Sequence, residues 1–206
     1  GFSAKAILVK LAYLGSVDAV TLLALRMVFA ALFFIGVAIW ARQHHAAPMD
    51  KRDRLLVVGL GLVGYYLSSY LDFLGLQYIT AGLERLILFL YPTMTVILAA
   101  LIFKQRITAK VLAAMALSYA GIALVFLHDV GVSQGDAVLI GAALVFASTL
   151  SYSIYLVGAG HAIARIGALR FTAYASLVAS AACVLQFLVM RPWSALDLPL
   201  QVYQYA

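Results

Sequence analysis

A succession of apolar segments, each long enough to cross a lipid bilayer, constrains this chain more than any other feature. Residues 19–40 contain a single charged side chain, that of Arg26. Further apolar runs of similar length cover residues 55–78, 81–103, 111–127, 137–157 and 171–190. Because a helix needs about 20 predominantly apolar residues to cross the hydrocarbon core, these runs predict a polytopic membrane protein.

The composition excludes an ordinary soluble domain. Of 206 residues, 66% are hydrophobic and 11% are charged, whereas soluble domains are about half apolar and about one-quarter charged. The net charge of +6 does not indicate a nucleic-acid partner, because the basic residues lie in short loops rather than on one solvated face. Residues 1–14 are too few to cross alone, and we interpret them as the end of a helix whose start is missing. No strand-like alternation occurs, so we predict an all-α membrane bundle of about seven helices.

The loops differ in positive charge, and this difference predicts their sides of the membrane. Loops rich in Lys and Arg stay in the cytoplasm. If the loop at residues 41–54 is cytoplasmic, that side carries Arg42, Lys51, Arg52, Arg54, Lys104, Arg106, Lys110, Arg165 and Arg170. The loops on the opposite side carry Arg191 alone. We therefore expect the missing N-terminus in the cytoplasm and Asp18, the expected N-cap of the second helix, on the outer side.

Several ionisable residues fall within the apolar runs, where each costs about 2.5–3.5 kcal/mol on insertion scales unless it finds a partner or a wet cavity. Those expected in the outer third of the membrane are Lys10, Arg26, Asp72, Glu84 and Arg85. They come from four helices but lie at one depth, about 5–10 Å from the outer ends of their helices. Two interpretations remain open, a structural ion-pair cluster and an outer gate or substrate vestibule.

Polar residues also recur at helical spacing within the runs. The stripes are Tyr65, Ser69 and Asp72; Glu84, Tyr91 and Thr95; Ser148, Tyr152 and Tyr155; and Thr172, Ser176 and Ser180. Four stripes suggest a shared interior cavity, although for the Ser and Thr positions we favour hydrogen bonds between helices. For Tyr91 we favour a functional role, because Pro92 interrupts the helix beside it and a broken helix can line a site.

Motifs of other functional classes either lie in a segment that does not suit them or are missing. Gly59, Gly61 and Gly64 have the spacing of a dinucleotide-binding loop, but they lie within an apolar helix with no preceding strand, which favours close helix packing. The histidines do not have zinc-site spacing, and nucleotide-binding and hydrolase motifs are missing. We therefore expect no metal, no cofactor and no enzymatic activity.

The sequence resembles the EamA-domain proteins of the drug/metabolite transporter superfamily, of the bacterial type. The most specific likeness is GLQYITAGLERLILFLYPT at residues 75–93, and weaker ones lie at residues 9–10, 24–26, 151–157 and 170–174. The resemblance implies ten helices in two five-helix repeats of inverted topology, with residues 1–128 in the first repeat and residues 137–206 at the start of the second. One departure is visible, because many members have Gly-Glu-Arg where this chain has Lys104, Gln105 and Arg106.

Taken together, these observations predict a secondary transporter of a bacterial inner membrane that exports small metabolites or drugs by alternating access, a function that the resemblance implies. The expected substrate path or gate consists of Lys10, Arg26, Tyr65, Asp72, Glu84, Arg85, Tyr91, Pro92 and Tyr155. Asp72 and Glu84 are candidates to carry a coupling proton. The alternatives are a membrane-embedded enzyme acting on lipid-like substrates and a passive receptor or assembly factor.

Overall fold

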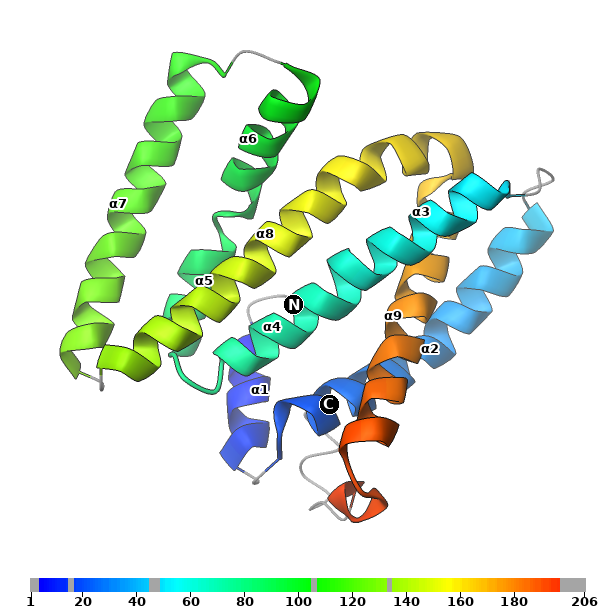
Figure 1. Ribbon diagram of the computed structural model, residues 1–206, viewed down its shortest axis with the longest axis horizontal. Helices are drawn as coiled ribbons and strands as arrows, with labels where there is room; N and C mark the ends of the chain where they lie inside the picture. Colours follow the sequence, from blue (N-terminus) through cyan, green and yellow to red (C-terminus); the bar gives the residue numbers. More distant parts are fainter. Residues whose placement is uncertain (1–3, 15–16, 45–48, 105–106, 133–134, 197–206) are drawn as a thin grey trace.

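The computed structural model describes residues 4–14, 17–44, 49–104, 107–132 and 135–196, and every regular element in these ranges is a helix (Figure 1). The elements are α1 (Ala4–Leu14), α2 (Ala19–His44), α3 (Lys51–Gly61), η1 (Leu62–Leu67), α4 (Ser68–Gly75), α5 (Ala81–Leu88), α6 (Tyr91–Phe103), α7 (Ala109–Val132), α8 (Gly135–Ile166), α9 (Ala168–Met190) and η2 (Trp193–Leu196). The expected departure from the family at Gln105 and Arg106 lies outside the described residues.

Within the described ranges, five helical segments are long and apolar enough to cross a membrane. They are Ala19–Gln43, Lys51–Gly75, Ala81–Phe103, Ala137–Ile166 and Ala168–Met190. The segment Lys51–Gly75 is one continuous rod made of α3, the six-residue π-helix η1 and α4. The prediction of an all-helical, multi-pass membrane bundle is therefore confirmed.

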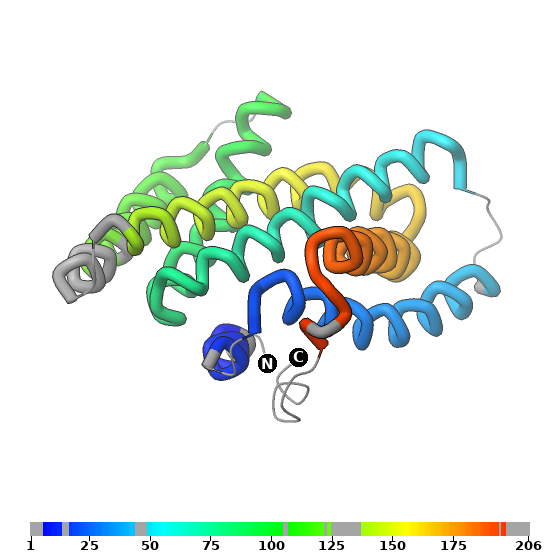
Figure 2. The backbone as a smooth tube through the Cα atoms, turned by 60° about the horizontal axis from the view of Figure 1, so that its bottom comes forward, coloured from blue at the N-terminus to red at the C-terminus, as the bar shows by residue number. Residues whose placement is uncertain are grey.

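Helix α8 lies at the centre of the bundle and packs against α4, α5, α6 and η1. The rod formed by α3, η1 and α4 packs against α8 on one side; on the other, α3 and η1 pack against α9, α4 packs against α2, and α9 packs along α2 (Figures 1 and 2). Helices α6 and α7 stand at the edge of the bundle (Figure 1). The rod and α8 therefore bring together helices that are distant in the sequence.

Two ion pairs define the two ends of the bundle. At the first, which we call the Asp18 end, the Asp18 carboxylate accepts hydrogen bonds from the backbone N–H of Val20 at 3.0 Å and from the Thr21 hydroxyl at 2.6 Å, which confirms it as the N-cap of α2. The same carboxylate pairs with Arg191, which follows α9, at 3.0 Å. Helices α2 and α9 are therefore antiparallel, since the start of one lies at the end of the other.

At the opposite end, which we call the Asp53 end, the first turn of α3 meets the last turn of α8. The Asp53 carboxylate lies 3.1 Å from the Arg165 guanidinium, and Asp53 is buried although Arg165 is half exposed. Asp50 caps α3 by accepting a hydrogen bond from the backbone N–H of Lys51 at 2.7 Å. The cap explains why this span begins at residue 51 rather than at the predicted residue 55.

Several predicted boundaries were wrong. Helix α8 was expected to end at residue 157 but continues through Gly158 to Ile166, and only Gly167, with a φ of 85°, separates it from α9. A Cβ atom at Gly158 would lie 2.7 Å from the Leu60 side chain, so this glycine permits close packing and does not end the helix. Similarly, the span predicted to end at residue 127 belongs to α7, which extends to Val132.

Candidate functional site

Four tyrosines from three different elements meet near the middle of the bundle, and we call them, with Phe171, the tyrosine cluster. Tyr155 of α8 donates a hydrogen bond from its hydroxyl to that of Tyr65 in η1 at 3.2 Å, and their ring centroids lie 5.1 Å apart. Tyr152 lies 5.6 Å from both Tyr155 and Tyr91 of α6, and Phe171 of α9 lies 6.0 Å from Tyr155. The predicted path residues Tyr65, Tyr91 and Tyr155 are thus brought together, with Tyr152 as the bridge.

The helix beside this cluster is broken. Instead of one helix interrupted at its middle by Pro92, the structure has two helices, and Pro92 stands in the first turn of α6, where its missing N–H is tolerated. At the break, α8 brings two hydroxyls close to carbonyl groups: the Thr149 hydroxyl lies 3.5 Å from the Ile87 carbonyl oxygen and the Ser153 hydroxyl lies 3.2 Å from the Tyr91 carbonyl oxygen, while each is also 2.8 Å from a carbonyl oxygen of α8 itself. Irregular backbone at membrane depth requires such partners.

The small hydroxyl side chains of α8 bind the backbone of other helices. Ser148 donates to the Ser68 carbonyl and Ser151 to the Val63 carbonyl, both at 2.7 Å. This confirms interhelical hydrogen bonding for Ser148. On α9, the Ser180 hydroxyl lies 3.9 Å from the Met27 sulfur, whereas the buried Ser176 hydroxyl has no hydrogen-bond partner among the described residues.

A second set of side chains, which we call the charge layer, lies closer to the Asp18 end and consists of Arg26, Asp72, Glu84 and Arg85. Glu84 is fully buried, and its carboxylate lies 3.1 Å from the Arg85 guanidinium. Arg26 of α2 is attracted by Asp72 of α4 and repelled by Arg85 of α5. Its guanidinium also lies over the Phe73 ring, 5.7 Å from the centroid, a favourable cation–π position.

The fifth residue predicted at this depth is Lys10. It lies on α1, is partly buried, and makes no ion pair within the described part of the chain. Helix α1 packs against α5, which carries Glu84 and Arg85. The structure therefore unites Arg26, Asp72, Glu84 and Arg85 and leaves Lys10 at their side.

The predicted stripe of Tyr65, Ser69 and Asp72 is not one continuous face. Tyr65 contacts Tyr155 of α8, whereas Asp72 interacts with Arg26 of α2, on the other side of the rod. Residues at these spacings share a face only in an unbroken α-helix. Here Tyr65 lies within the π-helix η1, which changes the register of the residues that follow it.

The glycines with dinucleotide-loop spacing serve helix packing, as predicted, at two of their three positions. A Cβ atom at Gly61 would lie 2.8 Å from the Ala175 carbonyl oxygen, and one at Gly64 would lie 2.2 Å from the Tyr155 ring. A Cβ atom at Gly59 would meet nothing within 4 Å. Two glycines therefore bring the rod against α9 and α8, and the third does not contribute to this packing.

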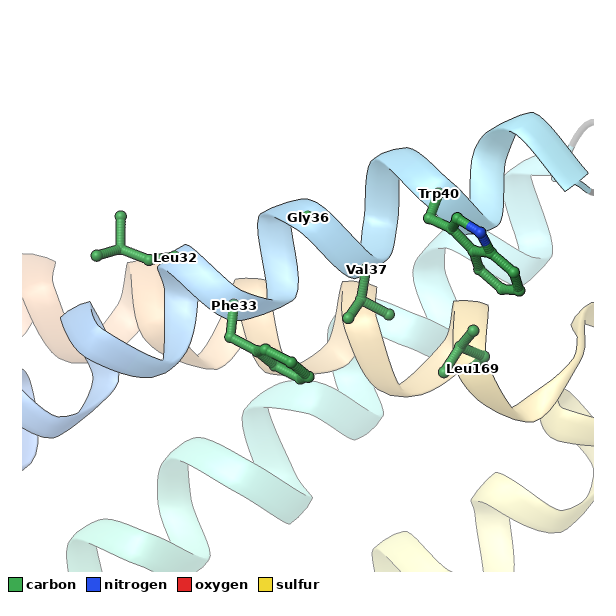
Figure 3. Close-up of a pocket in the computed structure, with 6 residues that line it drawn as sticks. All are labelled: Leu32, Phe33, Gly36, Val37, Trp40 and Leu169. Atoms are coloured by element: carbon green, nitrogen blue, oxygen red, sulfur yellow. The ribbon is translucent and has the colours of Figure 1, made fainter.

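An apolar groove of about 450 Å³ lies elsewhere, on the surface of α2 toward the Asp53 end (Figure 3). It is lined by Leu32, Phe33, Gly36, Val37, Trp40 and Leu169. None of the predicted path residues lines it. Phe171, Thr149 and Ser153 were not among the predicted site residues; for Thr149 and Ser153 the reason is that hydroxyls beside a break become recognisable only once the break is known.

These features define a multi-pass helical membrane protein whose polar and aromatic side chains gather where its helices pack, with Tyr91 still 39% exposed. Residues 2–127 match the EamA-like transporter family, and the chain belongs to this family. It is also 28% identical, over 202 residues, to the protein called uncharacterized transporter YcbK of Bacillus subtilis (strain 168). That alignment covers 98% of the chain and 64% of the relative, so the chain spans less than two thirds of the relative's length. No solved structure matches the chain.

Proposed function

We propose that the protein is a secondary transporter that exports small metabolites or drugs across a bacterial inner membrane by alternating access. Its family and its relative support a transporter rather than an enzyme. The observation that carries the proposal is the convergence of Tyr65, Tyr91, Tyr152 and Tyr155 beside a broken helix. Broken helices near mid-membrane are where secondary transporters bind their substrates.

The tyrosine cluster has a suitable depth for a substrate site. Tyr65 lies 14 residues after the start of the rod, or about 21 Å at a rise of 1.5 Å per residue, in a span of 25 residues. The rings of the tyrosine cluster offer apolar faces and its hydroxyls offer hydrogen-bond donors and acceptors, so the cluster suits small molecules that are partly apolar. The rings come from η1, α6 and α8, and a relative movement of these helices would open it.

The charge layer is suited to close the path on the outer side. Arg26 and Arg85 carry two positive charges beside the carboxyl groups of Asp72 and Glu84. Separating α2 from α4 and α5 would move the positive charge of Arg26 away from the carboxyl groups of Asp72 and Glu84. The charge layer therefore stays closed until a substrate or a proton weakens this attraction. We propose Asp72 and Glu84 as carriers of the coupling proton, because both are buried carboxyl groups at membrane depth.

We further propose that residues 1–128 form the first repeat, that residues 137–206 begin the second, and that the N-terminal side of α1 faces the cytoplasm. The antiparallel course of α2 and α9, the second helices of the two repeats, supports an inverted relation between them. The excess of Lys and Arg at the Asp53 end supports a cytoplasmic position for that end.

The test is counterflow of pooled amino acids, sugars, nucleosides and drugs by the full-length protein in proteoliposomes, with and without a pH gradient. Tyr155→Phe removes the hydroxyl bound to Tyr65, and we expect flux to fall about 2- to 10-fold, as one lost hydrogen bond allows. The matched control is Tyr119→Phe, because Tyr119 lies on α7 and is exposed.

A specific result would contradict each part of the proposed function. An equal flux in Tyr155→Phe and Tyr119→Phe would remove the tyrosine cluster from the path. A pH dependence left unchanged in both Asp72→Asn and Glu84→Gln would remove these carboxyl groups as proton carriers. Absence of flux for every pool would refute the transporter function itself.

A further inference from the structure

The π-helix η1 joins the tyrosine cluster to the part of the rod that carries the charge layer. Tyr65, in the cluster, is within it, and Asp72, in the charge layer, follows it by five residues. The backbone N–H of Ser68, the first residue after η1, is shared between the Val63 carbonyl five residues earlier and the Tyr65 carbonyl, where an α-helix would use the Gly64 carbonyl. π-Helices of this kind are rare, and those that occur are often found at functional sites.

The π-helix takes away the N–H that the Gly64 carbonyl would otherwise accept from Ser68. The Ser68 hydroxyl replaces it and donates to this carbonyl at 2.6 Å. A side chain at position 64 would force the Tyr155 side chain or the rod to move, because the Tyr155 ring occupies the space where its Cβ atom would lie. Ser68 thus satisfies the acceptor that the irregular backbone creates, in direct contact with the tyrosine cluster.

Helix α8 holds the same segment from outside. Ser151 donates to the Val63 carbonyl, and Ser148 donates to the carbonyl of Ser68, both at 2.7 Å. Ser68, Ser148 and Ser151 are all buried. The π-helix is therefore stabilised by one hydroxyl of its own rod and by two hydroxyls from α8, the helix that also carries Tyr152 and Tyr155.

The irregular segment determines where the two ends of the rod point. One residue in excess of the α-helical turn rotates everything beyond it by about 100° relative to a continuous α-helix. With η1 in place, Tyr65 contacts Tyr155 of α8, whereas the Arg26 guanidinium of α2 lies 5.7 Å from the centroid of Phe73, next to Asp72 in α4, where the opposite charges of Arg26 and Asp72 attract each other. A rod that relaxed to a regular α-helix would turn Asp72 away from Arg26 if Tyr65 kept its place.

We propose that Ser68 and Ser151 are positioning residues for transport, which hold η1 in the π form and thereby couple the tyrosine cluster to the charge layer. This inference rests on the proposed function. When α8 moves away from the rod, the Ser151 hydroxyl leaves Val63 and the regular α-helix, which gives the Gly64 carbonyl a backbone donor, becomes the better structure. Asp72 then rotates out of the charge layer, so that a movement at the cluster opens the outer closure.

The test measures whether Arg26 and Asp72 remain coupled when the π-helix loses its hydroxyls. Arg26→Gln, Asp72→Asn and the double substitution are prepared in the parent, in Ser68→Ala and in Ser118→Ala, and the melting temperature of the full-length protein is measured in detergent. Ser118 is the matched control, because its hydroxyl donates within the regular helix α7. In the parent and in Ser118→Ala we expect shifts that are non-additive by about 2 °C or more, as for a coupled pair in a chain of this length.

In Ser68→Ala we expect the two shifts to become additive, because Asp72 no longer faces Arg26. A purely local role of Ser68 would lower the melting temperature and leave the non-additivity unchanged, and that result would overturn the proposal. If Ser68→Ala does not fold, Ser151→Ala is used with the same expectation, since it leaves the rod's own hydrogen bonds intact. Counterflow is measured separately, so that absence of flux in the parent contradicts the proposed function and leaves the coupling result interpretable.

Discussion

Replacement of Gly64 by alanine tests how closely the rod approaches α8. The ideal Cβ atom at this position would lie 2.2 Å from Cγ, 2.3 Å from Cδ2 and 2.5 Å from Cβ of Tyr155. Because these atoms belong to the base of the side chain, a rotation of the ring does not remove them. The Tyr155 side chain or the rod has to move, and the hydrogen bond between Tyr155 and Tyr65 has to change with it.

The magnitude follows from two opposing terms. Overpacking by one methyl group costs about 1–3 kcal/mol, whereas alanine in place of glycine stabilises a helix by about 0.5–1 kcal/mol. We therefore expect Gly64→Ala to lower the free energy of unfolding by about 1–2 kcal/mol. Gly59→Ala, one turn earlier, meets nothing within 4 Å and has only the favourable term, about 0.5–1 kcal/mol.

The pair of variants is compared by reversible unfolding in mixed detergent micelles and by counterflow. We expect a difference in unfolding free energy of about 2 kcal/mol between Gly64→Ala and Gly59→Ala, and reduced flux in Gly64→Ala alone. Gly61→Ala, whose Cβ atom would lie 2.8 Å from the Ala175 carbonyl oxygen, should resemble Gly64→Ala. Equal stability of Gly64→Ala and Gly59→Ala would refute the close packing of the rod against α8.

Three further outcomes are expected. Asp18→Ala should lower the free energy of unfolding by about 1–2 kcal/mol, because the cap and the ion pair with Arg191 are lost. Burial raises the pKa of Asp18, but hydrogen bonds from Thr21 and the pairing with Arg191 outweigh burial and hold this pKa below its usual value. The contribution is therefore present above the unfolded pKa of about 3.9 and is lost as the pH falls through the lower folded pKa, and thermal unfolding of parent and variant between pH 6 and pH 2, roughly the range that spans both pKa values, measures it. Ser153→Ala should cost about 0.5–1.5 kcal/mol in the same unfolding assay, because the Tyr91 carbonyl at the break loses a hydroxyl that it shares with the Thr149 carbonyl of α8; an unchanged stability would show that this hydroxyl contributes nothing between the helices. The Cys183 thiol, 2% exposed, should react with a thiol reagent only after unfolding, and rapid labelling of the native protein would contradict the packing of α9.

The fold class was predictable because lipid imposes a simple requirement on sequence. A segment that crosses the membrane must be apolar over about 20 residues and must satisfy its backbone internally, so the apolar runs identified the spans directly. The ends of the spans were less predictable. Gly158 looked like a helix end, yet it lies inside α8 because glycine also permits close packing against Leu60.

The candidate site was predictable in its residue types and not in its geometry. Helical spacing identified Tyr65, Tyr155 and Asp72 as inward-facing residues, and the buried positions of Tyr155 and Asp72 agree with this. The spacing could not reveal that Tyr65 and Asp72 serve different neighbours, because no residue pattern in the rod signals the π-helix. Gly64 was a partial signal, since a conformational or packing reason is needed for a glycine within a helix.

The two irregular segments of the bundle, η1 and the break between α5 and α6, have one feature in common: α8 supplies the hydroxyls that cover both. Ser151 reaches η1, whereas Thr149 and Ser153 reach the break. Helix α8 itself is regular over 32 residues, so it acts as a template against which the two irregular helices are held. Since membrane depth leaves no water to replace these hydroxyls, a movement of α8 must disturb η1 and the break together. The tyrosines on α8 move with this helix, so their contacts in the tyrosine cluster change in the same movement.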